Sequence, residues 1–197
     1  MRISHIALFF ALLLGAADIA TAQDRPASPR GEASTQIGST DGPWLIVDYG
    51  RPILRGRTNP YGSGEEYGSG LNAGAPGWRA GANVSTTLTT ETDLGMGGTH
   101  VPAGTYTLFI ELTSPSQWTL IVSNHKAKSN FRSDEEGLWG SYGYTPDMDV
   151  ARVPMAVQPL EVMLDQFTIA FMNVSESGGQ IGFGWGANMG IASFEVH

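Results

Sequence analysis

The sequence predicts an all-β protein, an antiparallel β-sandwich or flattened barrel of about eight strands. Short apolar runs rich in β-branched and aromatic residues recur from Pro43 onward, and glycine, proline and serine separate them. Several of these runs alternate apolar and polar residues, which is typical of strands with one buried face. No stretch has a convincing helical pattern, so helices are not expected to contribute to the core.

The expected strands follow one another from Trp44 to the last residues of the chain. In the fourth of them, Trp118, Leu120 and Val122 fall on one face, which suits an antiparallel sheet packed on a second sheet. In order, the predicted strands are residues 44–49, 84–94, 105–112, 117–124, 150–157, 166–173, 180–185 and 191–196.

Turn residues separate most of these strands, but two connections are long. The first, residues 50–77, is rich in glycine and contains the near-repeat Tyr-Gly-Ser-Gly at Tyr61 and again at Tyr67. We expect a surface insertion there, with a mobile flap as the alternative. The second, residues 125–148, contains four aromatic residues and is expected to be at least partly packed.

The N-terminal part of the chain predicts export. Residues 1–22 have a basic start, a short apolar run and a small-x-small cleavage site, as a secretory signal peptide does. Residues 23–42 are expected to be a flexible leader or a segment lying along a sheet edge. A single β-sandwich domain is expected at 43–197, in a periplasmic or secreted protein that is not inserted in the membrane after signal cleavage.

Composition excludes several kinds of function. The chain has no cysteine, so disulfides, thiolate nucleophiles and Cys-ligated zinc are excluded. The net charge is −8 and only Lys126 and Lys128 are lysines, which disfavours nucleic acid and anionic membranes as partners. Histidine spacing predicts no metal site. A "GFGWG" run at 182–186 reads as strand glycines, so no cofactor is expected.

Three arginines are the candidate ligand-binding cations: Arg51, Arg57 and Arg79. Arginine is suited to clamp a carboxylate or phosphate because its planar guanidinium offers parallel donors. The alternative is that each arginine pairs with an internal carboxylate such as Asp48 or lies in water.

The stretch "GWRAGAN" (77–83) contains the remaining candidates, Trp78 and Asn83. If the strand at 84–94 extends back to Trp78, this indole falls on the core face, while Arg79, Gly81 and Asn83 share the polar face. Arg79 and Asn83 would then lie roughly 13 Å apart at about 3.3 Å per residue, so one small ligand reaches both only if Gly81 bends the strand.

Acidic residues give a second, weaker set of candidates. Residues 134–136 form the densest acidic cluster, and Asp147 with Asp149 the next; we expect both to be solvated loop charges. Asp147 or Glu136 with His125 could serve a hydrolase, but the sequence shows no pairing of groups that would tune their pKa values.

Seven motifs in this order resemble an exported bacterial family catalogued as domain of unknown function 2911. The resemblance runs from about Gln36 to the C-terminus, and "WRAGAN" is its most specific part; the others are "YGRP" (49–52), "RGR" (55–57), "VPAGTYTLF" (101–109), "WTLIVSN" (118–124), "WGSYGY" (139–144) and "FTIAF" (167–171). It implies an all-β domain behind a signal peptide, and it supplies no catalytic residue.

Three functions follow as hypotheses. We favour a non-enzymatic module that binds a small polar or anionic ligand, or an envelope partner, through Arg79, Asn83 and Arg51 or Arg57 beside Trp78. The alternatives are the carboxylate-based hydrolase and a purely structural envelope protein, in which Arg79 and Asn83 satisfy buried backbone groups.

Overall fold

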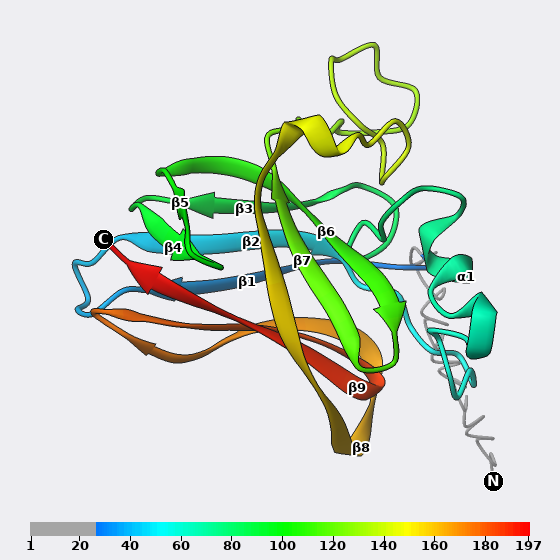
Figure 1. The fold of residues 1–197 in the computed structure, drawn as a ribbon. Helices are drawn as coiled ribbons and strands as arrows, with labels where there is room; N and C mark the ends of the chain where they lie inside the picture. Colours follow the sequence, from blue (N-terminus) through cyan, green and yellow to red (C-terminus); the bar gives the residue numbers. More distant parts are fainter. Residues whose placement is uncertain (1–26) are drawn as a thin grey trace, which may run out of the picture.

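Nine strands join into one open sheet in the described part of the chain, residues 27–197 of a computed structural model, and all neighbouring strands are antiparallel. The order across the sheet is β1-β2-β3-β6-β7-β8-β9-β4-β5. This confirms the predicted all-β fold (Figure 1). The elements are β1 (Arg30–Gln36), β2 (Trp44–Gly50), the 3-10 helix η1 (Gly64–Glu66), α1 (Ser69–Asn72), β3 (Thr86–Thr90), β4 (Leu94–Met96), β5 (Thr99–Val101), β6 (Gly104–Ser114), β7 (Gln117–Ser123), the 3-10 helix η2 (Pro146–Met148), β8 (Asp149–Ser175) and β9 (Gly178–Val196).

Two long strands carry the sheet from one layer to the other. The first part of β8 pairs with β7 and its last part pairs with β9, with a register shift between Pro159 and Leu164. β9 changes register at the same place, where Gly186 adopts a φ of 60°. In Figure 1 the orange parts of β8 and β9 therefore lie below β1, β2 and β3, which gives the molecule its sandwich-like layers, and the red end of β9 rises to pair with β4.

The long strands also change the expected strand list. The predicted strands at 150–157 and 166–173 are parts of β8, and those at 180–185 and 191–196 are parts of β9. The sequence predicted one strand at 84–94 followed by a turn. The short strands β4 and β5 lie at the end of that predicted strand and in the predicted turn. The turn at Pro115 joins β6 to β7 as a hairpin.

The segment expected to be a flexible leader contains a strand. β1 occupies residues 30–36 and pairs with all of β2, from Arg30 opposite Gly50 to Gln36 opposite Trp44. Backbone pairing orders a stretch whose side chains carry little apolar surface, so composition alone missed it. The other expectation for residues 23–42, a segment lying along a sheet edge, fits β1, because β1 is the first strand of the sheet. The expected signal peptide lies outside the described residues.

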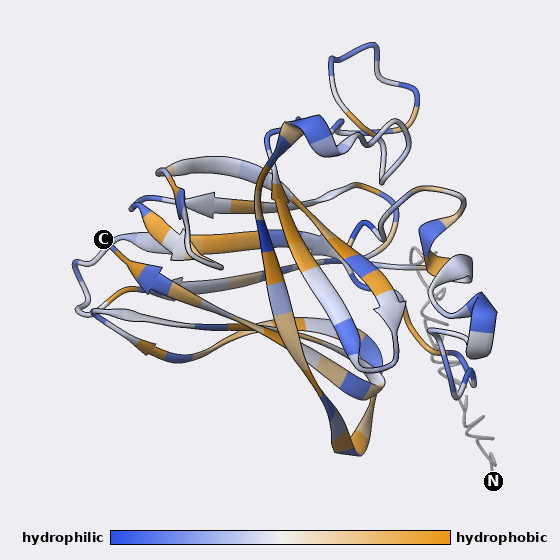
Figure 2. Ribbon diagram, viewed as in Figure 1, coloured by the Kyte–Doolittle hydropathy of each residue, from blue (hydrophilic) through white to orange (hydrophobic). Residues whose placement is uncertain are grey.

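The core between the layers is aromatic. Trp78, Trp118, Trp185, Phe167 and Phe183 are each exposed by 1% or less. The rings of Trp78, Trp185 and Phe167 pack edge to face or stacked, as with Trp78 and Phe167 at 4.9 Å between centroids. The apolar colours in Figure 2 lie mainly on the strands, and the connecting loops are mostly pale or blue.

Two buried tyrosines differ in how their hydroxyls are satisfied. The Tyr49 hydroxyl on β2 accepts a hydrogen bond from the Ile169 N–H on β8 at 3.1 Å, which ties the two layers together. The Tyr61 ring, from the long connection at 50–77, lies 4.8 Å from the Trp118 ring and is 1% exposed. Its hydroxyl has no hydrogen-bond partner within residues 27–197, and burial raises the pKa of this phenol.

This difference predicts opposite outcomes for two Tyr→Phe substitutions. Tyr49→Phe should lower the free energy of unfolding by about 1–3 kcal/mol, because it leaves the Ile169 N–H buried and unpaired. Tyr61→Phe should leave stability unchanged or raise it, because the removed hydroxyl makes no bond. Urea unfolding of the two variants checks this. Equal losses of unfolding free energy in the two variants would contradict the difference between the two hydroxyls.

Candidate functional site

The GWRAGAN stretch is a turn, not the start of a strand. Trp78 exchanges backbone hydrogen bonds with Ile110 of β6 at 2.8 Å each, but the chain then leaves the sheet. Ala80, Gly81 and Asn83 have φ values of 49°, 157° and 64°, and β3 begins only at Thr86. The extension of the predicted strand at 84–94 back to Trp78 is therefore wrong, and so is the shared polar row of Arg79, Gly81 and Asn83.

The indole of Trp78 explains why the turn closes there. Its Nε1–H donates to the Gly81 carbonyl oxygen at 2.9 Å, inside the core. A Cβ on Gly81 would come 2.7 Å from the Gly50 carbonyl oxygen, so only glycine allows this close approach. Trp78 and Ala80 are buried as predicted, but through a turn held by the indole rather than through strand alternation.

Arg79 leaves this turn toward the second long connection, residues 125–148, which we call the roof loop. Its guanidinium carbon lies 5.8 Å from the centre of the Tyr142 ring, and its Nη1 donates to the Asn83 carbonyl oxygen at 3.1 Å. A Cβ on Gly140 would lie 2.6 Å from that guanidinium carbon. Arg79 thus packs flat against the loop backbone, and no carboxylate of residues 27–197 forms an ion pair with it.

The other predicted arginines also bind backbone carbonyls. Arg51 Nε donates to the Phe167 carbonyl oxygen at 3.2 Å, and Arg57 donates to the carbonyl oxygens of Leu54 and Ile53 at 3.0 and 2.9 Å. Arg57 also lies over the Trp185 ring at 5.0 Å. Neither arginine pairs with a described carboxylate or has its guanidinium free in water.

The structure therefore does not gather the predicted site residues around one ligand. Arg79 and Asn83 share a turn, while Arg51 joins β2 to β8 and Arg57 lies beside Trp185. Asn83 is exposed, and its amide donates to the Ser28 carbonyl oxygen at 3.4 Å. These side chains hold segments of the chain together, and the bonds of Arg79 and Asn83 lie at the exposed surface.

The roof loop covers the outer face of β6 and β7 and forms a second, small core there. Phe109 and Ile121 point outward from these strands, and Tyr144 and Leu138 of the roof loop pack on them. The Phe109 and Tyr144 rings lie 4.7 Å apart. The prediction that this connection is partly packed is confirmed.

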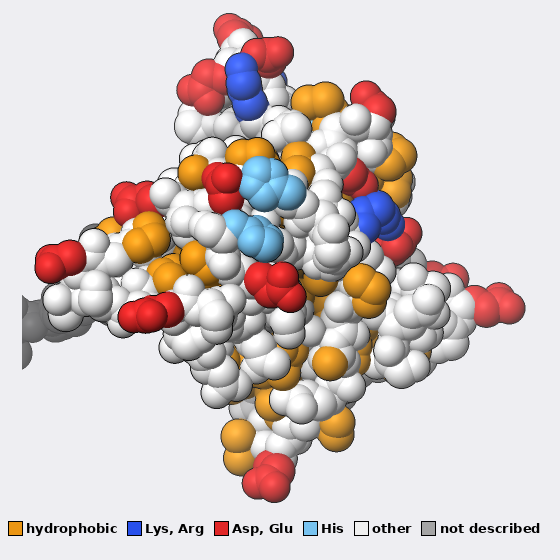
Figure 3. Space-filling view, turned by 60° about the vertical axis from the view of Figure 1, so that its left-hand side comes forward, with side chains coloured by type: hydrophobic (Ala, Val, Ile, Leu, Met, Phe, Trp, Pro, Cys, Tyr) orange, Lys and Arg blue, Asp and Glu red, His pale blue; other side chains and the backbone are white. Residues whose placement is uncertain are grey.

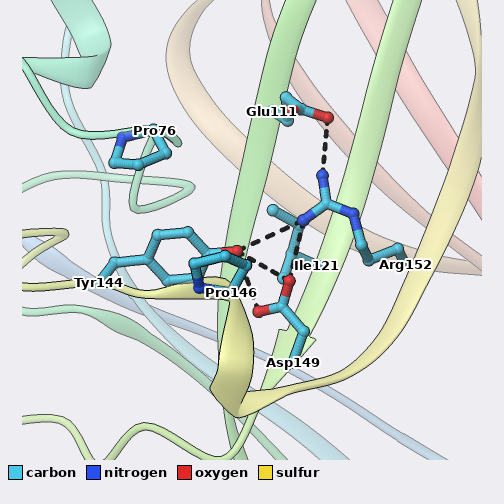
Figure 4. A pocket seen from close by; sticks show the side chains of 7 residues that line it. All are labelled: Pro76, Glu111, Ile121, Tyr144, Pro146, Asp149 and Arg152. Carbon is cyan, nitrogen blue, oxygen red and sulfur yellow. Dashed lines mark hydrogen bonds and ion pairs between the residues drawn. The ribbon is translucent and has the colours of Figure 1, made fainter.

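A cavity of about 370 Å³ opens beside this second core. Figure 4 shows Pro76 on one side and the polar side chains of Glu111, Asp149 and Arg152 on the other. The cavity combines an apolar floor with a charged wall, the usual make-up of a small-molecule site. Its apolar lining is Pro76, Ile121, Tyr144 and Pro146; its polar lining is Glu111, Asp149 and Arg152.

The charged wall is fixed by short contacts. Arg152 donates from Nη2 to Glu111 at 2.7 Å and from Nη1 to Asp149 at 2.8 Å. The Tyr144 hydroxyl lies 2.9 and 2.8 Å from the two oxygens of Asp149. The side chain of Asp149 is only 7% exposed, so its prediction as a solvated loop charge is wrong.

The wall has a net charge of −1, since one guanidinium faces two carboxylates. Partial burial works to lower the pKa of Arg152, but the bond to Asp149 and the charge of Glu111 outweigh it and raise that pKa. Burial raises the pKa of the Tyr144 hydroxyl, and the Asp149 carboxylate raises it further. The raised pKa keeps the guanidinium of Arg152 positively charged beside the two carboxylates.

The candidate hydrolase residues lie mainly on the other side of the roof loop. His125 and Glu136 line one cavity of about 510 Å³. The His125 Nε2 accepts a hydrogen bond from the Thr145 N–H at 3.1 Å, and Glu136 pairs with Lys126 at 3.0 Å in solvent. Asp147 is exposed; its bonds with Thr145 and with its own backbone lower its pKa. The acids at 134–136 are exposed, as predicted.

Figure 3 shows two neighbouring histidine side chains among acidic ones; the rings of His100 and His197 lie 6.1 Å apart. Within the described residues, no group of three or more potential ligands could hold a metal ion. None of the helices in that range has the length and hydropathy needed to span a bilayer.

Comparison with protein families gives one match. A family model described as protein of unknown function (DUF2911) matches residues 28–192. The chain belongs to the DUF2911 family. No match was found among curated proteins or among solved structures.

In this DUF2911 protein, two of the family-like motifs meet in space. Arg79 of "WRAGAN" packs on Gly140 and Tyr142 of "WGSYGY", and Ser85 donates to the Gly140 carbonyl oxygen at 2.7 Å. The motifs therefore build a contact that holds the roof loop, and Tyr144, the last residue of "WGSYGY", also lines the cavity.

Sequence reasoning missed the cavity wall. Glu111 and Arg152 lie 41 residues apart and meet only because β6, β7 and β8 are adjacent in the sheet. A weak signal was present: Glu111 and Arg152 are the only charged residues within the predicted strands at 105–112 and 150–157. A charge at such a position often has a partner on a neighbouring strand.

The contact between Arg79 and the roof loop predicts a local loss of stability. Arg79→Ala should lower the free energy of unfolding by about 1–2 kcal/mol, because it removes a charged hydrogen bond and the contact with Tyr142. Arg132→Ala, in the same loop and fully exposed, serves as the control and should change little. Chemical unfolding followed by tryptophan fluorescence measures both. Equal values for the two variants would contradict the bracing role.

The buried Tyr144 hydroxyl predicts a dependence on alkaline pH. Its raised pKa means that the folded protein keeps this proton more tightly than the unfolded chain. The resulting stability is complete below about pH 10, the ordinary tyrosine value, and is lost as pH rises above it. Tyr144→Phe should therefore lose stability less steeply above pH 10 than wild type. The exposed Tyr142→Phe is the control, and a wild-type slope in Tyr144→Phe would contradict the prediction.

Proposed function

We propose that this DUF2911 protein is a binding module that holds a small, uncharged, hydroxyl-rich molecule in the cavity between Pro76 and Arg152. The observation that carries the proposal is the guanidinium of Arg152, fixed between Glu111 and Asp149 at the edge of an apolar cavity. We also propose, from the sequence of residues 1–22, that the protein works in the periplasm or is secreted.

The wall offers both donors and acceptors to a ligand. The side chains of Glu111 and Arg152 are 41% and 40% exposed, so carboxylate lone pairs and guanidinium N–H groups remain accessible beside their mutual bond. A hydroxyl can donate to Glu111 and accept from Arg152, and a pair of adjacent hydroxyls can do both. Pro76 and Pro146 supply apolar surface for the C–H face of such a molecule.

Charge argues for a neutral ligand rather than the anionic one that the arginines suggested. An anion would meet two carboxylates and a guanidinium whose charge they already neutralise. The proposal is limited to binding, because each carboxylate of the wall is paired with Arg152.

A ligand panel with one matched pair of variants tests this function. Neutral mono- and disaccharides, polyols, organic acids and amines are compared by calorimetry and thermal shift. We expect stabilisation by members of the neutral hydroxylated group. Glu111→Gln should weaken that binding about 10- to 100-fold, since it removes a charged acceptor.

Glu195→Gln is the control, because Glu195 is an exposed residue of β9 outside this cavity. The Glu195→Gln variant should bind the neutral hydroxylated ligands with the affinity of wild type. Stabilisation by organic acids alone, or unchanged binding in Glu111→Gln, would reject the proposal.

A further inference from the structure

We propose that residues 59–75 form a lid that opens as one unit while the β-sheet stays folded. The lid contains η1, α1 and the two tyrosines of the near-repeat, Tyr61 and Tyr67. It ends next to Pro76, one wall of the cavity described above. That a ligand enters through this opening rests on the proposed function. The opening of the lid itself does not depend on that function.

The hydrogen bonds of the lid close almost entirely within it. Its backbone bonds join lid residues to one another, including Gly68 N–H to the Tyr61 carbonyl oxygen at 2.7 Å. The side chains of Asn59 and Ser69 likewise bond within the lid. A segment that satisfies its own backbone can move without breaking the ladders of the sheet.

The flanks, in contrast, are fixed to the sheet. Before the lid, the Leu54 N–H donates to the Asp165 carbonyl oxygen at 2.7 Å, and Ile53 forms a bridge with Gln166. After the lid, Trp78 exchanges two backbone bonds with Ile110. Between these anchors, no backbone hydrogen bond within the described residues joins the lid to the rest of the chain.

Aromatic packing and one polar contact hold the lid closed. The Tyr61 ring inserts among Trp78, Trp118 and Trp185, at centroid distances of 6.3, 4.8 and 6.4 Å. The Tyr67 hydroxyl accepts a hydrogen bond from Trp118 Nε1 at 2.8 Å.

Both buried side-chain atoms without a partner in residues 27–197 belong to this lid: the Tyr61 hydroxyl and Asn72 Oδ1. Closing the lid therefore removes these atoms from water with no bond in return, which weakens the closed state. The glycine at each end, Gly56 before the lid and Gly74 within its last residues, has a φ of 83°, a conformation that glycine adopts readily.

A single engineered thiol reports the opening, because the chain has no cysteine. Leu112 lies directly beneath the lid: a Cβ on Gly68 would come 2.9 Å from the Leu112 Cβ. Leu120, on β7, is fully buried, pairs with Ile110 within the sheet and serves as the matched position. Leu112→Cys and Leu120→Cys are labelled with iodoacetamide under native conditions, with no ligand present.

We expect the thiol at position 112 to be labelled at least tenfold faster than the thiol at position 120. Adding Tyr67→Phe, which removes the bond to Trp118, should speed labelling at position 112 several-fold and leave position 120 unchanged. Tyr106→Phe, whose hydroxyl bonds Pro102 outside the lid, should not change the ratio. Equal labelling rates at 112 and 120 would overturn the lid.

Hydrogen exchange of the unaltered protein gives the same test without a substitution. The amides of Gly68, Leu71 and Asn72 should exchange at least tenfold faster than those of β6 and β7. Exchange of all these amides at one common rate would show that only global unfolding exposes them, and would overturn the proposal. Neither measurement uses a ligand. A result against the lid proposal is therefore distinct from a result against the binding proposal, which the ligand panel tests.

Discussion

The position of Trp78 is the constraint on which the candidate site depends. Its backbone pairs with Ile110 while its indole is enclosed by Phe167, Trp185 and Tyr61, so the chain at this point cannot shift along the sheet. The indole N–H then closes the turn at Gly81. A buried aromatic ring with a satisfied donor is a strong fixed point in a core.

The position of Trp78 also determines which residues cover the outer face of the sheet. The turn aims Arg79 at Gly140 and Tyr142, and this contact helps to hold the roof loop over Phe109 and Ile121. The roof loop in turn brings Tyr144 to Asp149 at the cavity wall. Arg79 thus contacts the roof loop and lies outside the lining of the cavity.

The same tryptophan is also one wall of the socket that receives Tyr61, so the lid and the roof loop meet at a common element. The two loops differ in how they are attached. The roof loop is tied by a small core and by the Ser85 bond, whereas the lid relies on ring packing and one hydrogen bond to Trp118. The roof loop is therefore the more firmly attached of the two loops that border the cavity.

The sequence by itself determined the β class, most strand positions and the partly packed second loop, because these depend on local alternation and turn residues. It also marked Trp78 as core. Only the tertiary structure decided that residues 30–36 form a strand, since pairing with β2 orders them. It likewise decided that Arg79 braces a loop, because the φ values at Ala80 and Asn83 break the alternation on which the polar row was based. The contact between Glu111 and Arg152 depends on the order of β6, β7 and β8 across the sheet, which residue patterns along one strand do not encode.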